Sequence, residues 1–233
     1  MNTETMTERP RLAANPPRSL PQLWSWPLWL LLGVALGSPW LAVAAGTEVP
    51  VLWWAARAFG FVSYVALWIA MLSGVLVGAK GIDGLIDRKV LLELHQQWTL
   101  SGVVATVAHL LAVVTNAHAG IGVMGALVPF ASPSMTGAVG VGAVAFWAFG
   151  LMAATSWWRT RIPYTAWRAI HALAFGAFLL ALIHSVASGT DSGAPLVRWL
   201  YVASGSLLAG AISVRLLVAL GGRRHATDAS RPS

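Results

Sequence analysis

Two long apolar stretches of the chain each carry a pair of histidines. His95 and His109 are fourteen residues apart in "LHQQWTLSGVVATVAHL", and His171 and His184 are thirteen apart in "AWRAIHALAFGAFLLALIHSVASGTD". Both stretches are long enough to cross a membrane as helices. An imidazole within hydrocarbon is costly unless it has a partner. The matched pairs therefore predict that the four histidines hold a bound partner and are not isolated within the hydrocarbon.

The spacing within each pair corresponds to much of the depth of a bilayer. Fourteen residues rise about 21 Å along an α-helix, and at about 100° per residue His95 and His109 fall within about 40° of one face. Both histidine-bearing segments begin on the same side of the membrane in the predicted topology, so they run parallel. If they are neighbours, the first histidine of each pair faces its counterpart at one depth, and the second does so at the other.

Two facing imidazoles at one depth match the axial ligands of a six-coordinate haem b, whose porphyrin supplies the other four nitrogens. The residues therefore predict two haems b. The predicted iron ligands are His95 and His171 for the inner haem, and His109 and His184 for the outer haem. Two such sites about 21 Å apart would cover most of a hydrocarbon core of about 30 Å. This arrangement predicts electron transfer across the bilayer.

The second pair does not fit an ideal helix. Thirteen residues leave His171 and His184 about 140° apart around the helix axis. Either this helix is distorted, for example at Gly176, or the two haems lie on different sides of it.

Other roles for the histidines were weighed against haem. A single intramembrane histidine often packs against a neighbouring helix through a hydrogen bond. A zinc or copper site needs its ligands clustered at one depth, together with thiolates or carboxylates that the apolar segments lack. The chain has no Cys, which excludes disulfides, thiolate metal sites, iron–sulfur clusters and Cys-attached c-type haem.

Composition predicts the fold class. The 233 residues are 57% hydrophobic and 10% charged, with a mean hydropathy of +0.70, which is too apolar for an ordinary soluble domain. We expect an all-α integral membrane bundle of six transmembrane helices over 23–220, a disordered tail at 1–22 and a second tail at 221–233. The expected spans are at about 23–45, 56–79, 92–115, 137–158, 165–188 and 196–220.

The positions of Lys and Arg predict the orientation. They cluster before the first span, after the second and fourth, and after the last, which places both termini in the cytoplasm and the protein in the cytoplasmic (inner) membrane. Because the basic residues lie at the ends of apolar segments, the net charge of +7 does not indicate nucleic acid. The loop 116–136 then faces outward, and we expect a short interfacial helix there. A signal peptide cleaved after "LAVAAG" is the alternative for the first span.

Two arginines are further candidate cofactor-binding residues. Arg168 lies one turn before His171 and is a candidate partner for a propionate of the inner haem. Arg57, together with Arg198, is a candidate for the outer propionates. The alternative for each is a basic residue that anchors the helix end at the membrane surface.

At these residues the chain resembles the ferric reductase-like transmembrane domain family. That family includes the membrane parts of ferric reductases and NADPH oxidases, and the haem subunit of the bacterial methionine sulfoxide reductase system. The resemblance rests on the six-helix layout, the histidine spacings of 14 and 13, "LVPFASP" (127–133) and "HSVASGTDSG" (184–193), and it covers about 55–215. It implies an electron path from the cytoplasmic side through the inner haem to the outer haem.

The resemblance to the oxidases stops at the last helix. About a dozen residues follow it, so we expect no FAD or NADPH domain. The glycines of 137–150 lie inside an apolar helix and are interpreted as packing glycines. The expected electron donor is then a separate flavoprotein, a membrane quinol or quinone, or a bound FMN or FAD, and no motif supports a bound flavin or quinone.

Two other functions stay open from the sequence. One is a haem-binding subunit that serves an extracytoplasmic partner such as a periplasmic reductase. The other is a non-redox helical bundle, a transporter or an assembly factor, in which the histidines pack or relay protons. The scarcity of intramembrane acids argues against proton-coupled transport.

Overall fold

The computed structural model describes residues 33, 44, 51–78 and 86–229. Regular structure within these residues is entirely helical, which confirms the predicted all-α class. The elements are α2 (Val51–Val77), α3 (Arg88–Thr115), η2 (Ala117–Ala119), α4 (Gly122–Leu127), α5 (Thr136–Trp157), η3 (Arg159–Arg161), α6 (Tyr164–Ala172), α7 (Ala174–Ser188) and α8 (Pro195–Ala229). The predicted tail at 1–22 and nearly all of the predicted first span at 23–45 lie outside the described residues.

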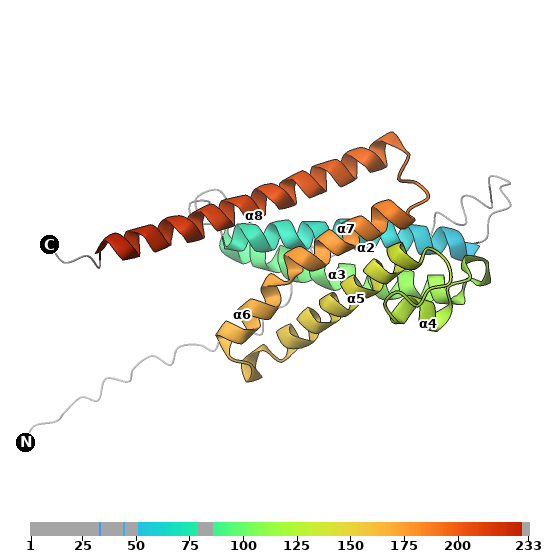
Figure 1. Ribbon diagram of the computed structural model, residues 1–233, viewed down its shortest axis with the longest axis horizontal. Coiled ribbons are helices and arrows are strands. Elements are labelled where there is room, and N and C mark those ends of the chain that lie inside the picture. The colour runs from blue at the N-terminus through green and yellow to red at the C-terminus, as the bar shows by residue number, and fades with distance from the viewer. Residues whose placement is uncertain (1–32, 34–43, 45–50, 79–85, 230–233) are drawn as a thin grey trace, which may run out of the picture.

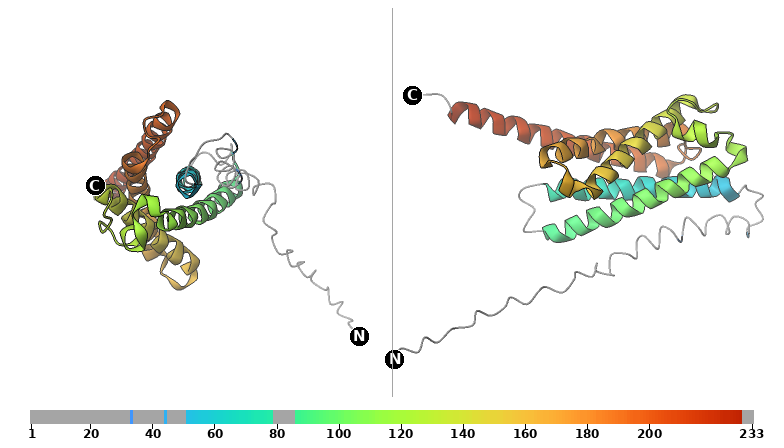
Figure 2. Two further views of the ribbon diagram at one scale, coloured as in Figure 1. Left: turned by 90° about the vertical axis from the view of Figure 1, so that its right-hand side faces the viewer. Right: turned by 90° about the horizontal axis from the view of Figure 1, so that it is seen from below.

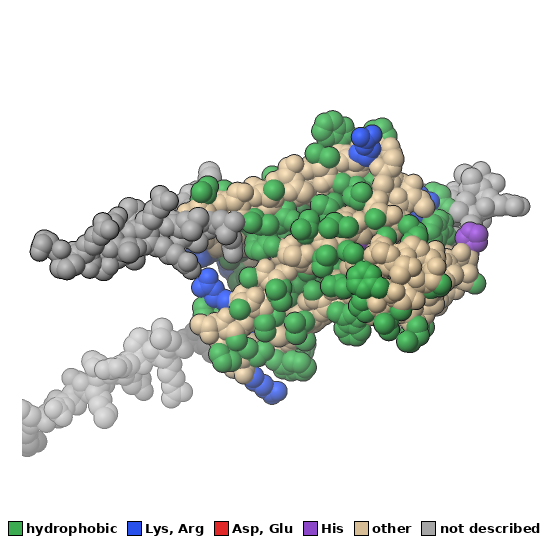
Figure 3. Space-filling model, in the orientation of Figure 1, with side chains coloured by type: hydrophobic (Ala, Val, Ile, Leu, Met, Phe, Trp, Pro, Cys, Tyr) green, Lys and Arg blue, Asp and Glu red, His purple; other side chains and the backbone are tan. Residues whose placement is uncertain are grey.

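Five segments of the described chain are long and apolar enough to cross a membrane. They are Val51–Val77, Arg88–Thr115, Thr136–Trp157, Tyr164–Ser188 and Pro195–Val214. They confirm the second to sixth predicted spans by length and composition. Large apolar side chains point outward along them, as on a surface that meets lipid, and they are spread over the helices on the face drawn in Figure 3.

The last helix is longer than predicted. α8 continues to Ala229, whereas the sixth span was expected to end at about 220. No proline interrupts the chain between Pro195 and Pro232, so helical hydrogen bonding continues past the apolar segment.

The long helices alternate in direction along the bundle (Figures 1 and 2). α2 packs chiefly against α3, and α5 packs chiefly against α7. Because the directions alternate, α3 and the α6–α7 segment run in the same direction. Both run from the end of the bundle that holds α6 and η3 toward the end that holds α4. These two ends are called the α6 end and the α4 end below.

Small residues let α2 and α3 approach closely. A Cβ atom added to Gly102 of α3 would lie 2.7 Å from the side chain of Leu67 on α2. Nearby, the hydroxyl of Ser63 lies 2.5 Å from that of Thr106. Close approach of backbones and short polar side chains are the usual means by which helices associate in lipid.

The predicted fifth span is interrupted by a break at Leu173. The N–H of Leu173 donates to the carbonyl of Ile170, 3.0 Å away, and α7 starts at Ala174. A three-residue hydrogen bond tightens the helix locally and changes the rotation between the parts on either side. Of the two alternatives for the thirteen-residue spacing, a helix distortion is therefore present, and it lies at Leu173 and not at Gly176, which is an ordinary residue of α7.

The loop at the α4 end contains the expected short helix. α4 is six residues long, and the indole N–H of Trp147 on α5 donates to the carbonyl of Leu127 at its end, 2.8 Å away. This contact holds α4 over one end of the space between the two helix pairs. Phe130 follows with a positive φ of 63°, and its ring occupies the space beside Gly140 where a Cβ atom would otherwise lie.

Candidate functional site: two facing histidine pairs

The four histidines meet in two pairs, each joining α3 to the α6–α7 segment. The ring centres of His95 and His171 are 5.9 Å apart near the α6 end. Those of His109 and His184 are 6.3 Å apart nearer the α4 end. The ring planes are inclined by 76° in both pairs. The break at Leu173 lies between the two histidines of this segment, and each of them faces a histidine of α3.

Backbone carbonyls of a neighbouring helix orient three of the imidazoles. Nδ1 of His95 lies 2.7 Å from the carbonyl oxygen of Ala70 on α2. The corresponding distances are 2.7 Å from His109 to Ala56 on α2, and 2.8 Å from His184 to Ala138 on α5. A carbonyl only accepts, so each Nδ1 carries the proton. Nε2 of the neutral ring is then the nitrogen with a lone pair for a metal.

A glycine four residues after each of these carbonyls makes room for the imidazole. A Cβ atom added to Gly60 would lie 3.2 Å from Nδ1 of His109, and one added to Gly74 would lie 2.9 Å from Nδ1 of His95. A Cβ atom added to Gly142 would collide directly with the ring of His184. On a helix the residue four positions later lies next to the carbonyl along the same face. Any larger residue would therefore obstruct the histidine's approach to its acceptor.

Sequence reasoning did not identify these glycines as part of the site, although a signal was present. The carbonyl acceptors Ala56 and Ala70 are fourteen residues apart, as are Gly60 and Gly74, and this equals the spacing of the two histidines on α3. Because α2 and α3 are antiparallel, the order of partners is reversed. The glycines of 137–150 were interpreted as packing residues, and Gly142 packs specifically against a candidate ligand.

His171 is oriented by ring stacking. Its imidazole lies 4.9 Å from the ring of Trp167, with the planes inclined by 22°. The two residues are four positions apart on α6, so they share a face of the helix. This contact places a tryptophan directly behind the pair at the α6 end.

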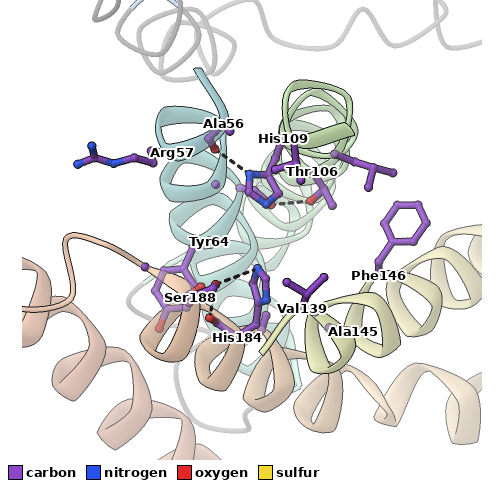
Figure 4. A pocket seen from close by; sticks show the side chains of 18 of the residues that line it. Ala56, Arg57, Tyr64, Thr106, His109, Val139, Ala145, Phe146, His184 and Ser188 are labelled. Atoms are coloured by element: carbon purple, nitrogen blue, oxygen red, sulfur yellow. Dashed lines mark hydrogen bonds between the residues drawn. The ribbon is translucent and has the colours of Figure 1, made fainter. Parts of the chain in front are cut away.

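A cavity surrounds the pair at the α4 end (Figure 4). It lies between the α2–α3 pair and the α5–α7 pair, and it contains about 1400 Å³ of space, a figure that includes its open mouth. Figure 4 shows His109 and His184 projecting into it from opposite sides. Much of the remaining lining is apolar, including Leu67, Val113, Val139, Phe146 and Phe149. Such a lining suits a large planar apolar group.

The distances fit a metal centre between the histidines. Two imidazoles on opposite sides of one metal, each bonded at about 2.0–2.1 Å, have ring centres about 6 Å apart. Both pairs match that separation. Within the described ranges no three His, Cys, Asp or Glu side chains gather into a metal-binding group, and each facing pair offers two candidate histidine ligands. A group that brings its own four equatorial ligands fits this donor set.

The candidate propionate-binding arginines have other contacts. Arg57 lines the cavity, but its guanidinium makes a two-pronged ion pair with Asp191, with Nε 2.8 Å from Oδ2. It also lies over the ring of Trp54, 4.9 Å from the centroid. Arg168 is exposed, and its guanidinium lies over Tyr164. Arg198 is exposed at the start of α8. Asp191, which the sequence did not single out, is thus part of the mouth of the cavity.

Together the fold and the site define a helical protein with five candidate membrane spans among its described residues and two facing histidine pairs. The chain belongs to the family described as a domain of unknown function (DUF8596), whose match covers residues 51–191 and includes all four histidines. No curated protein matches the sequence. No solved structure matches the chain.

Proposed function

We propose that this protein is a di-haem b membrane protein that carries electrons across the bilayer. The observation that supports this most directly is the repetition of one arrangement at two depths. In each, two imidazoles face one another at the separation a single metal requires. The histidine spacings that resemble the ferric reductase-like transmembrane domain family support the same conclusion.

In this proposal His95 and His171 hold the inner haem, and His109 and His184 hold the outer haem. Haem supplies one-electron redox chemistry at its iron. The chain's own contribution is to fix the ligand nitrogens and exclude water. Hydrogen bonds from Nδ1 to the carbonyls of Ala56, Ala70 and Ala138 keep Nε2 unprotonated and make the imidazoles more basic, which favours the oxidised metal.

The proposed direction of electron flow follows the resemblance to the ferric reductase-like transmembrane domain family, and the distribution of basic residues supplies the orientation of the chain. With the α6 end in the cytoplasm, electrons pass from a cytoplasmic flavoprotein or a membrane quinol to the inner site, then to the outer site. The acceptor is on the extracytoplasmic side, as ferric iron or a partner reductase. A haem held by both histidines of a pair would have no free position at its iron, so transfer would be outer-sphere and direct binding of O₂ would be disfavoured.

A reduced-minus-oxidised visible spectrum of the purified protein tests the proposal. We expect a b-type spectrum with close to two haems per chain. Each of the substitutions His95→Ala, His109→Ala, His171→Ala and His184→Ala should lower the haem-to-protein ratio. His118→Ala is the matched control, because His118 is exposed in η2 and belongs to neither pair. A colourless protein from haem-replete cells would refute the proposal.

A further inference from the structure

A stack of three rings connects the inner histidine pair to the surface at the α6 end. Tyr164, Trp167 and His171 are spaced by three and four residues, so they lie on one face of α6. The ring centres of Tyr164 and Trp167 are 5.9 Å apart with planes inclined by 26°, and Trp167 stacks on His171 at 4.9 Å. Tyr164 is 65% exposed. The stack therefore extends from an exposed tyrosine ring at the surface to the imidazole of His171, a proposed iron ligand.

Two arginine side chains lie over the tyrosine and tryptophan rings of this stack. The guanidinium of Arg159 is 5.7 Å from the centre of Trp167, and that of Arg168 is 5.6 Å from the centre of Tyr164. Both arginines are exposed, as is Arg161 between them in sequence. The ion pairs found among the described side chains involve Arg57 and Lys89, and none of these three arginines. Their positive charge is therefore uncompensated by a carboxylate within this part of the chain.

Exposed aromatic rings continue this surface. Trp157 is 86% exposed and Trp158 is 52% exposed, immediately before Arg159. Aromatic residues and arginine are the side chains most enriched at the centres of protein interfaces. Here they occur together beside a ring stack that leads to the inner pair. The surface formed by Trp157, Trp158, Arg159, Arg161, Tyr164 and Arg168 is called the α6 face below.

We infer that the α6 face is the docking site of an acidic soluble electron-donor protein, and that the stack carries its electrons inward. This inference rests on the proposed function, and it assigns the donor to a protein with a negatively charged surface. In each transfer the donor's reduced flavin loses one electron and the ferric inner site gains it. No covalent bond forms or breaks. The positive charge of the face complements such a partner and accelerates its encounter.

Stopped-flow reduction tests the docking face. The full chain is placed in nanodiscs of neutral phosphatidylcholine, which removes anionic headgroups as an explanation, and reduced flavodoxin serves as the acidic probe. We expect Arg159→Ser and Arg168→Ser each to lower the second-order rate roughly 2- to 5-fold at low salt, and the difference to vanish at high salt. Arg198→Ser is the matched control, since Arg198 is exposed at the start of α8, at the opposite end of the bundle, and is not among the described residues that line the cavity around the outer pair.

Substitution of the central ring tests the stack separately from the charge. Trp167→Leu should slow reduction at every salt concentration, and Trp167→Phe should restore most of the rate, with each rate expressed per bound haem because Trp167 also stacks on His171. Equal rates for the arginine variants and for Arg198→Ser would overturn the docking face. An arginine effect confined to nanodiscs containing anionic lipid would overturn it as well, and would identify the arginines as headgroup anchors.

The wild-type spectrum separates this inference from the proposed function. A colourless wild-type protein refutes both. A b-type spectrum combined with insensitive variants at the α6 face refutes the docking site alone, and a rate insensitive to Trp167→Leu refutes the stack alone.

Discussion

The substitution Gly142→Ala probes the geometry on which the site depends. The added Cβ atom would lie 2.7 Å from Cε1 and 2.9 Å from Cγ of His184. Carbon atoms in contact are normally about 3.5–4.0 Å apart, so the imidazole must move by about 1 Å. The hydrogen bond from Nδ1 of His184 to the carbonyl of Ala138, now 2.8 Å, cannot survive that displacement in its present form.

The expected cost has two parts. Losing a hydrogen bond of this kind destabilises a protein by about 0.5–1.5 kcal/mol, and forcing an extra methyl group into a packed site costs about 1–3 kcal/mol. Loss of a residue that orients a metal ligand typically weakens metal binding by about 10- to 100-fold. We therefore expect Gly142→Ala to lower haem affinity at the outer site by about that factor, and to lower the unfolding temperature.

Haem titration of the apoprotein, followed at the Soret band, measures the affinity, and thermal unfolding measures stability. Gly150→Ala on the same helix is the matched control, because no atom lies within 4 Å of its added Cβ. Gly60→Ala should have a smaller effect, since its Cβ would be 3.2 Å from Nδ1 of His109. The reasoning is wrong if Gly142→Ala binds haem as tightly as Gly150→Ala.

Three further substitutions test contacts that hold the bundle together, each by thermal unfolding in detergent. Tyr64→Phe should destabilise the protein by about 0.5–1.5 kcal/mol, because it removes one hydrogen bond of the buried Ser204 hydroxyl, which keeps its bond to the carbonyl of Tyr201; equal stability of Tyr64→Phe and wild type would refute this. Gly102→Ala should destabilise the protein by about 1–3 kcal/mol, because its methyl group collides with Leu67, and combining it with Leu67→Ala should recover part of this loss of stability. If the stability losses of the two single substitutions simply add in the double variant, the contact is contradicted. Asp191→Asn should cost at most about 1 kcal/mol, since the ion pair at the mouth of the cavity is partly exposed, and this small loss should shrink further at high salt.

Part of the fold and site could be predicted because the relevant signals are local. A span of about twenty apolar residues must form a helix in lipid, since its backbone polar groups have no other partners. Accordingly, most boundaries of the described spans lie within a few residues of the predicted boundaries. The choice of His95, His109, His171 and His184 depended only on residue type and spacing along such helices.

The features that were missed depend on contacts between helices. The break at Leu173 corresponds to one of two alternatives, because the thirteen-residue spacing fits either a distorted helix or sites on different sides of it. Helix geometry alone does not show where a distortion occurs. Arg57 was considered as a propionate partner, and only the fold shows that Asp191, distant in sequence, reaches its guanidinium.

The sequence by itself therefore determined the membrane-spanning character of the chain and the four histidines at two depths. Both follow from hydrophobicity and helical rise, which are properties of each segment alone. Only the tertiary structure decided which carbonyl orients each imidazole, why Gly60, Gly74 and Gly142 are needed, and that Trp167 stacks behind His171. These depend on which helix faces are neighbours, and association of helices in lipid is determined by close packing that no single segment encodes.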